Sequence, residues 1–172
     1  MAAIAEYCSY DALDLAELVE KGEVSPIELV DEVVRRIERV SGRLNAVVHR
    51  MDARAREQAA GTLPDGPLRG VPFLVKDLLQ MIAGEPTSDG CRFLQGYTVG
   101  YDTELIKRYR KAGLVLVAKT NTPEHGLTPF TCASPHFSLA EQVENPWGPG
   151  CVGISGPQEA DESGNTQEPE QR

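Results

Sequence analysis

Two short segments that are apolar throughout most constrain the fold of this chain. They are residues 71–75 (VPFLV) and 114–118 (LVLVA), and a helical pattern over 103–112, which Gly113 closes, lies between them. A strand without polar positions is buried on both faces, and two such strands joined through a helix pair in parallel. The sequence therefore predicts an α/β fold. Pro72 has no N–H to donate, so we place it near the start or at the edge of its strand.

Helical patterns also precede these strands. Residues 26–40 repeat apolar side chains at helical spacing, and Ser25 with Glu28 forms a capping box at their start. Gly42 is expected to end this helix. Weaker patterns predict a helix over 11–21 that begins at Asp11 or Ser9 and ends at Gly22, a short strand over 45–49, an Ala-rich helix over 53–60 capped by Asp52, turns over 61–70 and mostly irregular structure over 78–101.

The composition changes near the C-terminus. Residues 156–172 hold one hydrophobic residue, Ala160, with five acids and one base. Such a segment buries too little apolar surface to offset the entropy lost on ordering. We therefore expect a structured part over 1–150 and a disordered acidic polar tail over 151–172.

The charge balance limits the partners. Acids outnumber bases by 26 to 17, a net charge of −9, which disfavours binding to nucleic acids and anionic membranes. The sequence contains no run of 18 apolar residues, so we expect no membrane-spanning helix. The first thirty residues carry several acids and no apolar secretory core, so a cytoplasmic location is expected.

Potential metal and cofactor motifs are weak. The four cysteines form no C-x-x-C pair: Cys8, Cys91, Cys132 and Cys151. Cys132 and His136 lie in a Pro-rich stretch, and Glu124 and His125 precede them closely. We interpret this grouping as accidental and expect no metal.

A glycine pattern near the C-terminus also lacks its expected context. Gly148, Gly150 and Gly153 match the dinucleotide-binding spacing, but no strand precedes them and no helical pattern follows. We therefore expect no cofactor.

Lys76 follows the first apolar strand directly. A lysine there can simply extend into water. Alternatively it can be desolvated, which favours a neutral amine able to accept a proton from a serine nucleophile. The residue pattern alone leaves both interpretations open.

Several segments resemble the amidase signature family, in the family's order. They are Gly22–Pro26, Gly66–Leu78, Arg92–Leu94, Asp102–Thr103, Ala112–Thr128 and Asn145–Trp147. The resemblance implies the N-terminal part of an α/β/α fold with a mixed, partly parallel sheet. It also implies hydrolysis of amide C–N bonds in small molecules by a Ser–cisSer–Lys triad, in which Lys76 matches the catalytic lysine. Residues 120–124 (TNTPE) look like the general and cyclic-amide amidases rather than the tRNA-dependent amidotransferases.

The chain departs from the family's serine-bearing segments. Ser155 lies within one position of the bridging serine, but its flanking residues differ from the family's glycine-serine pattern. The nucleophilic serine would fall beyond Arg172, so we expect this chain to be inactive alone. An alternative is a non-catalytic protein- or ligand-binding module derived from an amidase, with self-association or aggregation through exposed sheet edges.

Overall fold

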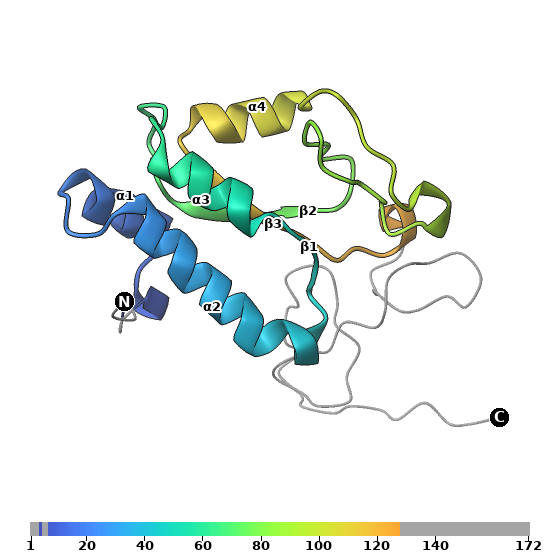
Figure 1. Ribbon diagram of the computed structural model, residues 1–172, viewed down its shortest axis with the longest axis horizontal. Coiled ribbons are helices and arrows are strands. Elements are labelled where there is room, and N and C mark those ends of the chain that lie inside the picture. The colour runs from blue at the N-terminus through green and yellow to red at the C-terminus, as the bar shows by residue number, and fades with distance from the viewer. Residues whose placement is uncertain (1–3, 5–6, 128–172) are drawn as a thin grey trace, which may run out of the picture.

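The computed structural model describes residues 4 and 7–127 (Figure 1). The regular elements, in chain order, are α1 (Ala12–Glu20), α2 (Pro26–Leu44), β1 (Val47–Arg50), α3 (Asp52–Ala60), β2 (Pro72–Lys76), α4 (Glu104–Lys111) and β3 (Val115–Thr120). Three 3-10 turns cover Tyr7–Ser9, Arg92–Leu94 and Glu124–Gly126. The predicted boundary at residue 150 and the predicted tail over 151–172 lie outside the described residues.

The three strands form one mixed sheet in the order β1-β3-β2. The central strand β3 runs parallel to β2 and antiparallel to β1. The α/β class and the parallel pairing of the two apolar segments are therefore confirmed. Pro72 is both the first residue of β2 and a member of an edge strand, where its missing N–H removes no ladder bond that the sheet needs.

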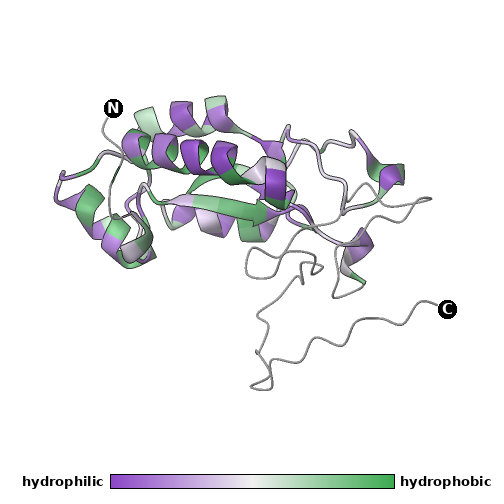
Figure 2. Cartoon of the chain, turned by 90° about the horizontal axis from the view of Figure 1, so that it is seen from below, coloured by the Kyte–Doolittle hydropathy of each residue, from purple (hydrophilic) through white to green (hydrophobic). Residues whose placement is uncertain are grey.

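Helices cover both faces of the sheet, and β3 contributes side chains to the core on each face. Val115 and Val117 pack in one core cluster with residues of α2 and α3, including Val34. Leu116 packs on the other face in a second cluster with Ile106 of α4. Figure 2 shows the hydrophobic sheet between helices above and below it. This burial on both faces explains why residues 114–118 are apolar without interruption.

The helix starts follow their capping residues. The Asp11 carboxylate accepts hydrogen bonds from the backbone N–H groups of Leu13 and Asp14, at 2.7 and 2.9 Å. Ser25 and Glu28 make the predicted capping box of α2. Each side chain thereby satisfies backbone donors that have no partner inside the helix.

Two predicted helix boundaries are wrong. The helix α2 runs through Gly42 to Leu44, because the left-handed position is taken by Asn45, with φ of 51°. The Asn45 N–H donates to the carbonyl of Ser41 at 2.7 Å and closes the last turn. Asp52 is the first residue of α3 rather than its cap, and the capping position belongs to Met51, which makes no side-chain cap bond.

The turn before β2 is fixed against the end of α4. The Leu68 N–H donates to the carbonyl of Ala112, and the Gly70 N–H donates to the carbonyl of Gly113, both at 2.9 Å. The Val115 N–H then donates to the carbonyl of Val71 at 2.9 Å. The turn over 61–70 therefore sets the start and the register of the parallel strands.

No helix among residues 7–127 is long and apolar enough to cross a membrane. β1 and β2 are the edges of the three-stranded sheet, and association through them stays a prediction.

Two glycines that follow helices provide a matched test of this packing. Gly113 has φ of 91°, and a Cβ there would lie 2.5 Å from the Cα of Arg69, whereas Gly22 has φ of 71° and open space around it. Gly22→Ala should lower the free energy of unfolding by about 1–2 kcal/mol, the cost of left-handed backbone. Gly113→Ala should cost about 1–3 kcal/mol more, because the close backbone must move. Urea unfolding of both variants measures the difference, and equal losses would contradict the close approach.

Candidate functional site

The carboxyl ends of β2 and β3 bring three charged residues to one edge of the sheet. Lys76 is the last residue of β2, Asp77 follows it, and Lys119 precedes the last residue of β3. The parallel register pairs Lys76 with Thr120, and Lys119 with Val75. Because side chains alternate along a strand, Lys76 and Lys119 point to opposite faces of the sheet. In open α/β sheets, ligands bind outside the carboxyl ends of the strands.

Lys119 is fully buried in an ion pair. None of its surface is exposed, and it is the largest fully buried side chain of the described core. Its ammonium donates to the Asp77 carboxylate, with 2.9 Å between Nζ and Oδ1. A buried ammonium is tolerated only when a partner compensates its lost hydration, so this pair fixes the two strand ends together.

The Asp77 carboxylate also binds the loop that follows β2. It accepts hydrogen bonds from the Thr87 hydroxyl at 3.1 Å, and from the Ser88 hydroxyl and backbone N–H at 2.7 and 3.0 Å. Burial alone would raise the pKa of Asp77. The hydrogen bonds from Ser88 and Lys119, with the Lys119 charge, outweigh that effect and hold the pKa below its ordinary value.

Lys76 has a different environment. Its side chain is half-buried, and its ammonium makes no hydrogen bond or ion pair with any residue in the described part of the chain. Of the two lysines at the strand ends, Lys119 is committed to Asp77 while Lys76 has its nitrogen available. A lysine with an available nitrogen at the end of a strand can take part in proton transfer.

A cavity of about 390 Å³ opens beside this edge of the sheet. His49, Asp77, Ser88 and Thr122 contribute to its lining. Lys76 does not line it, although the adjacent Asp77 does. The cavity therefore presents hydroxyl, carboxylate and imidazole groups next to the carboxyl ends of the parallel strands.

A second ionic network borders the same cavity. The His49 Nε2 lies 2.7 Å from Glu85 Oε2, and Arg54 Nη1 donates to Glu85 Oε1 at 2.8 Å. Burial would raise the pKa of Glu85, but hydrogen bonds from Arg54 and His49 outweigh it and lower the pKa. This network attaches β1 and α3 to the loop that carries Glu85.

The structure brings together residues that the sequence patterns did not connect. The sequence patterns did not predict the pairing of Lys119 with Asp77. A signal was present, because Lys76 and Lys119 each follow an apolar segment, and parallel strands end at the same edge of a sheet. Glu124 and His125 lie beside Cys91, a possible set of metal ligands. Cys132, His136, Ser155 and the glycine pattern over 148–153 lie outside the described residues.

Comparison with known proteins identifies similar sequences. A sequence model of the Amidase family matches residues 28–155. A 6-aminohexanoate-cyclic-dimer hydrolase of Paenarthrobacter ureafaciens is 37% identical over 118 residues, which are 67% of this chain and 24% of that protein. A glutamyl-tRNA(Gln) amidotransferase polypeptide of Salinispora tropica is 37% identical over 148 residues, or 81% of this chain and 29% of its own length. The similarity therefore extends to both kinds of protein, and the preference for cyclic-amide amidases stays a prediction.

Solved structures agree with this similarity. A 6-aminohexanoate cyclic dimer hydrolase complexed with substrate has a TM-score of 0.73 at 33% identity, covering 83% of this chain and 29% of that one. A bacterial aryl acylamidase of the amidase signature family has a TM-score of 0.73 at 28% identity, over 85% of this chain and 31% of its own. The chain thus spans about a quarter to a third of the length of these relatives.

The pair of Asp77 and Lys119 predicts a specific dependence of stability on pH. Because the pKa of Asp77 is lowered in the folded state, its stabilisation is complete above the unfolded value of about 3.9 and is lost as the pH falls through the folded value. At pH 7, Asp77→Asn should cost about 3–5 kcal/mol, because the Lys119 charge is left uncompensated. The difference from the unmodified chain should be constant above about pH 4 and should shrink as the pH falls further.

Urea unfolding across this pH range measures the effect. Asp65→Asn is the matched control, because Asp65 is an exposed aspartate in the turn over 61–70. It should change the free energy of unfolding by less than about 0.5 kcal/mol at each pH. A difference between Asp77→Asn and the unmodified chain that grows as the pH falls below about 4 would contradict the charged pair.

Proposed function

This chain belongs to the amidase signature family, and from that membership we propose that it carries the lysine of an amide-hydrolysing site. Lys76 is the proposed catalytic base for cleavage of amide C–N bonds. The relatives include hydrolases of small amides. The chain spans only part of their length, so the activity, substrate and partners of a whole protein are part of the proposal.

One observation carries the assignment to Lys76. The two strand-end lysines of the described chain differ in their partners, because Lys119 is paired with Asp77 while Lys76 is not paired with any described residue. A general base must have its nitrogen available to a substrate or to another side chain. The commitment of Lys119 to Asp77 therefore supports Lys76 as the residue available for proton transfer.

The proposed chemistry follows the Ser–cisSer–Lys scheme that the family resemblance implies. The neutral amine of Lys76 accepts a proton from a bridging serine, which in turn takes the proton of the nucleophilic serine. The serine oxygen attacks the amide carbonyl, the C–N bond breaks, and the leaving nitrogen receives the proton. Water then hydrolyses the acyl-enzyme and restores the serine. Asp77 acts as a positioning residue, because it joins the end of β2 to Lys119 and to the loop at Ser88.

A second part of the proposal concerns whether the 172 residues hydrolyse amides by themselves. No serine of the described part is bonded to Lys76, and Ser155 is the proposed counterpart of the bridging serine only by its position. We propose that these 172 residues do not hydrolyse amides without the serine-bearing nucleophile segment. A triad without its nucleophile loses essentially all covalent catalysis.

Exposed apolar side chains support a second proposal, that the chain contacts another polypeptide through them. Leu79, Phe93 and Leu127 are 67%, 92% and 81% exposed. A continuous patch of exposed apolar side chains is typical of surfaces that bind a partner, and this alternative proposes that the three side chains belong to one. In this alternative the chain is a non-catalytic binding module, and its cavity would bind a ligand without turnover.

A chimera tests the assignment of Lys76. The 118 matching residues of the Paenarthrobacter ureafaciens hydrolase are replaced with those of this chain, and hydrolysis of the cyclic dimer of 6-aminohexanoate is measured. Lys76→Met in the chimera should lower kcat by about 10²–10⁴-fold, the usual contribution of a general base. The 172-residue chain itself, with the same substrate, should show no turnover above the buffer.

The matched control is Lys107→Met, because Lys107 is exposed on α4. It should change kcat by less than about twofold. Thermal melting establishes that each chimera is folded before its rate is interpreted. Equal activity of the Lys76→Met and unmodified chimeras would exclude Lys76 as the base. Turnover by the 172-residue chain that Lys76→Met abolishes would contradict its proposed inactivity.

A further inference from the structure

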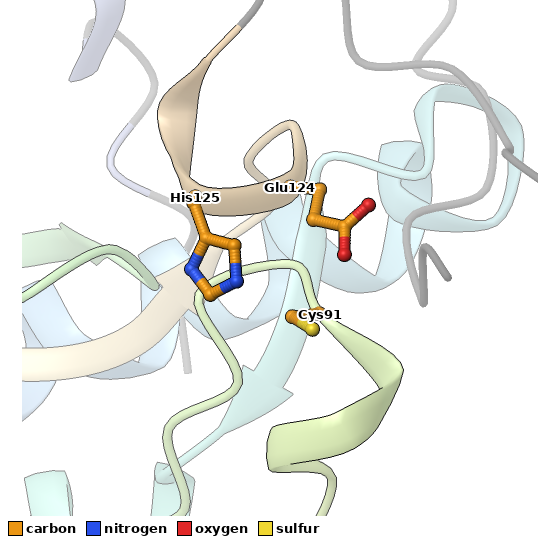
Figure 3. Close-up of side chains that lie close together, drawn as sticks. All are labelled: Cys91, Glu124 and His125. Carbon is orange, nitrogen blue, oxygen red and sulfur yellow. The ribbon is translucent and has the colours of Figure 1, made fainter.

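Three potential metal-binding side chains converge from two loops. The Cys91 sulfur, a Glu124 carboxylate oxygen and a His125 ring nitrogen all lie within 4.8 Å of one another. Figure 3 shows Glu124 and His125 on the turn after β3, facing Cys91 at the start of the Arg92–Leu94 turn. These residues are separate from Lys76 and from the Asp77–Lys119 pair. We propose that they bind a divalent cation of the zinc class.

The backbone holds the two loops together at this point. The His125 N–H donates to the carbonyl of Asp89 at 2.7 Å. Gly90 has φ of 69°, and a Cβ there would lie 2.6 Å from the carbonyl oxygen of Thr122. Only a glycine allows the loops to approach so closely, and the next residue along the chain is Cys91. The position of the thiol beside the turn is therefore fixed by backbone contacts.

A left-handed residue directs the other two side chains. His125 has φ of 49° and ψ of 18°, inside the turn over Glu124–Gly126. Successive side chains of an extended chain point in opposite directions. The left-handed turn instead brings the side chains of Glu124 and His125 to the same side. Histidine is among the residues that adopt this conformation more readily than most.

The three side chains have no other partners in the part of the chain that the structure describes. Neither the Glu124 carboxylate nor the His125 ring makes a hydrogen bond or an ion pair with residues 7–127. Cys91 is buried, with 6% of its surface exposed, and it is a free cysteine. The donor atoms of Glu124 and His125 are therefore available to an ion that also contacts the Cys91 sulfur.

The donor set indicates the metal. Thiolate, imidazole and carboxylate are the ligands of zinc, at about 2.3 Å for sulfur and about 2.0–2.2 Å for nitrogen and oxygen. Ligands at those distances around a tetrahedral ion lie about 3.3–3.8 Å apart, so small rotations of the three side chains close the site. Three protein ligands leave the fourth position to water. Binding converts the thiol to a thiolate and releases its proton to the solvent.

The proposed ion would connect the loop after β2 to the turn after β3. Ser88, Gly90 and Thr122, close to the ligands in the chain, line the cavity beside the strand ends. A metal at Cys91 would therefore hold one wall of that cavity in place. This role does not depend on amide hydrolysis, so the metal site and the function of Lys76 can fail separately.

Cobalt binding tests the site on the 172-residue chain. After treatment with a chelator, the chain is titrated with Co²⁺, whose bond to a thiolate gives a charge-transfer band in the near ultraviolet. One Co²⁺ per chain should bind, the band should appear, and Zn²⁺ should displace it. Cys91→Ser should abolish the band, and Glu124→Gln or His125→Ala should weaken binding about tenfold or more.

The matched control removes the other cysteine–histidine pair, in the double variant Cys132→Ser and His136→Ala. It should retain the band and the affinity within about twofold. Thermal melting covers the case in which Cys91→Ser does not fold, because Zn²⁺ should raise the Tm of the unmodified chain but not that of Glu124→Gln. A chain that binds no Co²⁺, a band that persists in Cys91→Ser, or a band lost in the control would each overturn the proposal.

Discussion

The buried pair of Asp77 and Lys119 is the interaction on which the rest of this structure depends. A lysine without exposed surface must have a compensating charge, and Asp77 is the only carboxylate bonded to it among residues 7–127. The pair crosses between the two parallel strands at their carboxyl ends. Through the same carboxylate it also fixes Thr87 and Ser88 of the following loop. The position of the cavity wall at Ser88 is therefore set by the requirement to neutralise one buried ammonium.

This arrangement divides the two strand-end lysines between different roles. The register places Lys119 on the same face as Val75, in the interior, and Lys76 on the opposite face. The proposed base is thus held on a rigid strand next to a rigid ion pair, as a site that must keep its geometry requires. The metal site proposed at Cys91 would add a second constraint on the same loop.

The sequence patterns predicted local structure well where one residue determines it. The capping residues Asp11 and Ser25 were identified because a side chain that accepts from the first turn has a short-range signature. Gly42 shows the limit of this reasoning, since a glycine tolerated inside a helix looks like a glycine that ends one. The helix α2 ends before Asn45 because Asn45 takes the left-handed conformation. The sequence pattern instead indicated an end at Gly42, three positions earlier.

The site was predictable only in part, because its contacts join distant residues. The position of Lys76 followed from an apolar strand and a family resemblance. The partnership of Lys119 with Asp77 joins residues 42 positions apart and depends on the parallel register, which the apolar runs indicate only in outline. Cys91 comes from a stretch without periodicity, and its approach to His125 depends on one close backbone contact at Gly90. Such contacts leave no pattern in the sequence itself.

The most direct test compares the two lysines in the same unfolding experiment. The free energies of unfolding of Lys76→Met and Lys119→Met are measured in urea at neutral pH. We expect a loss of about 3–5 kcal/mol for Lys119→Met, because Asp77 is left buried without its cation. Lys76→Met should cost less than about 1 kcal/mol, because its ammonium has no partner among the described residues. Equal losses, or a larger loss for Lys76→Met, would contradict the division of roles between the two lysines.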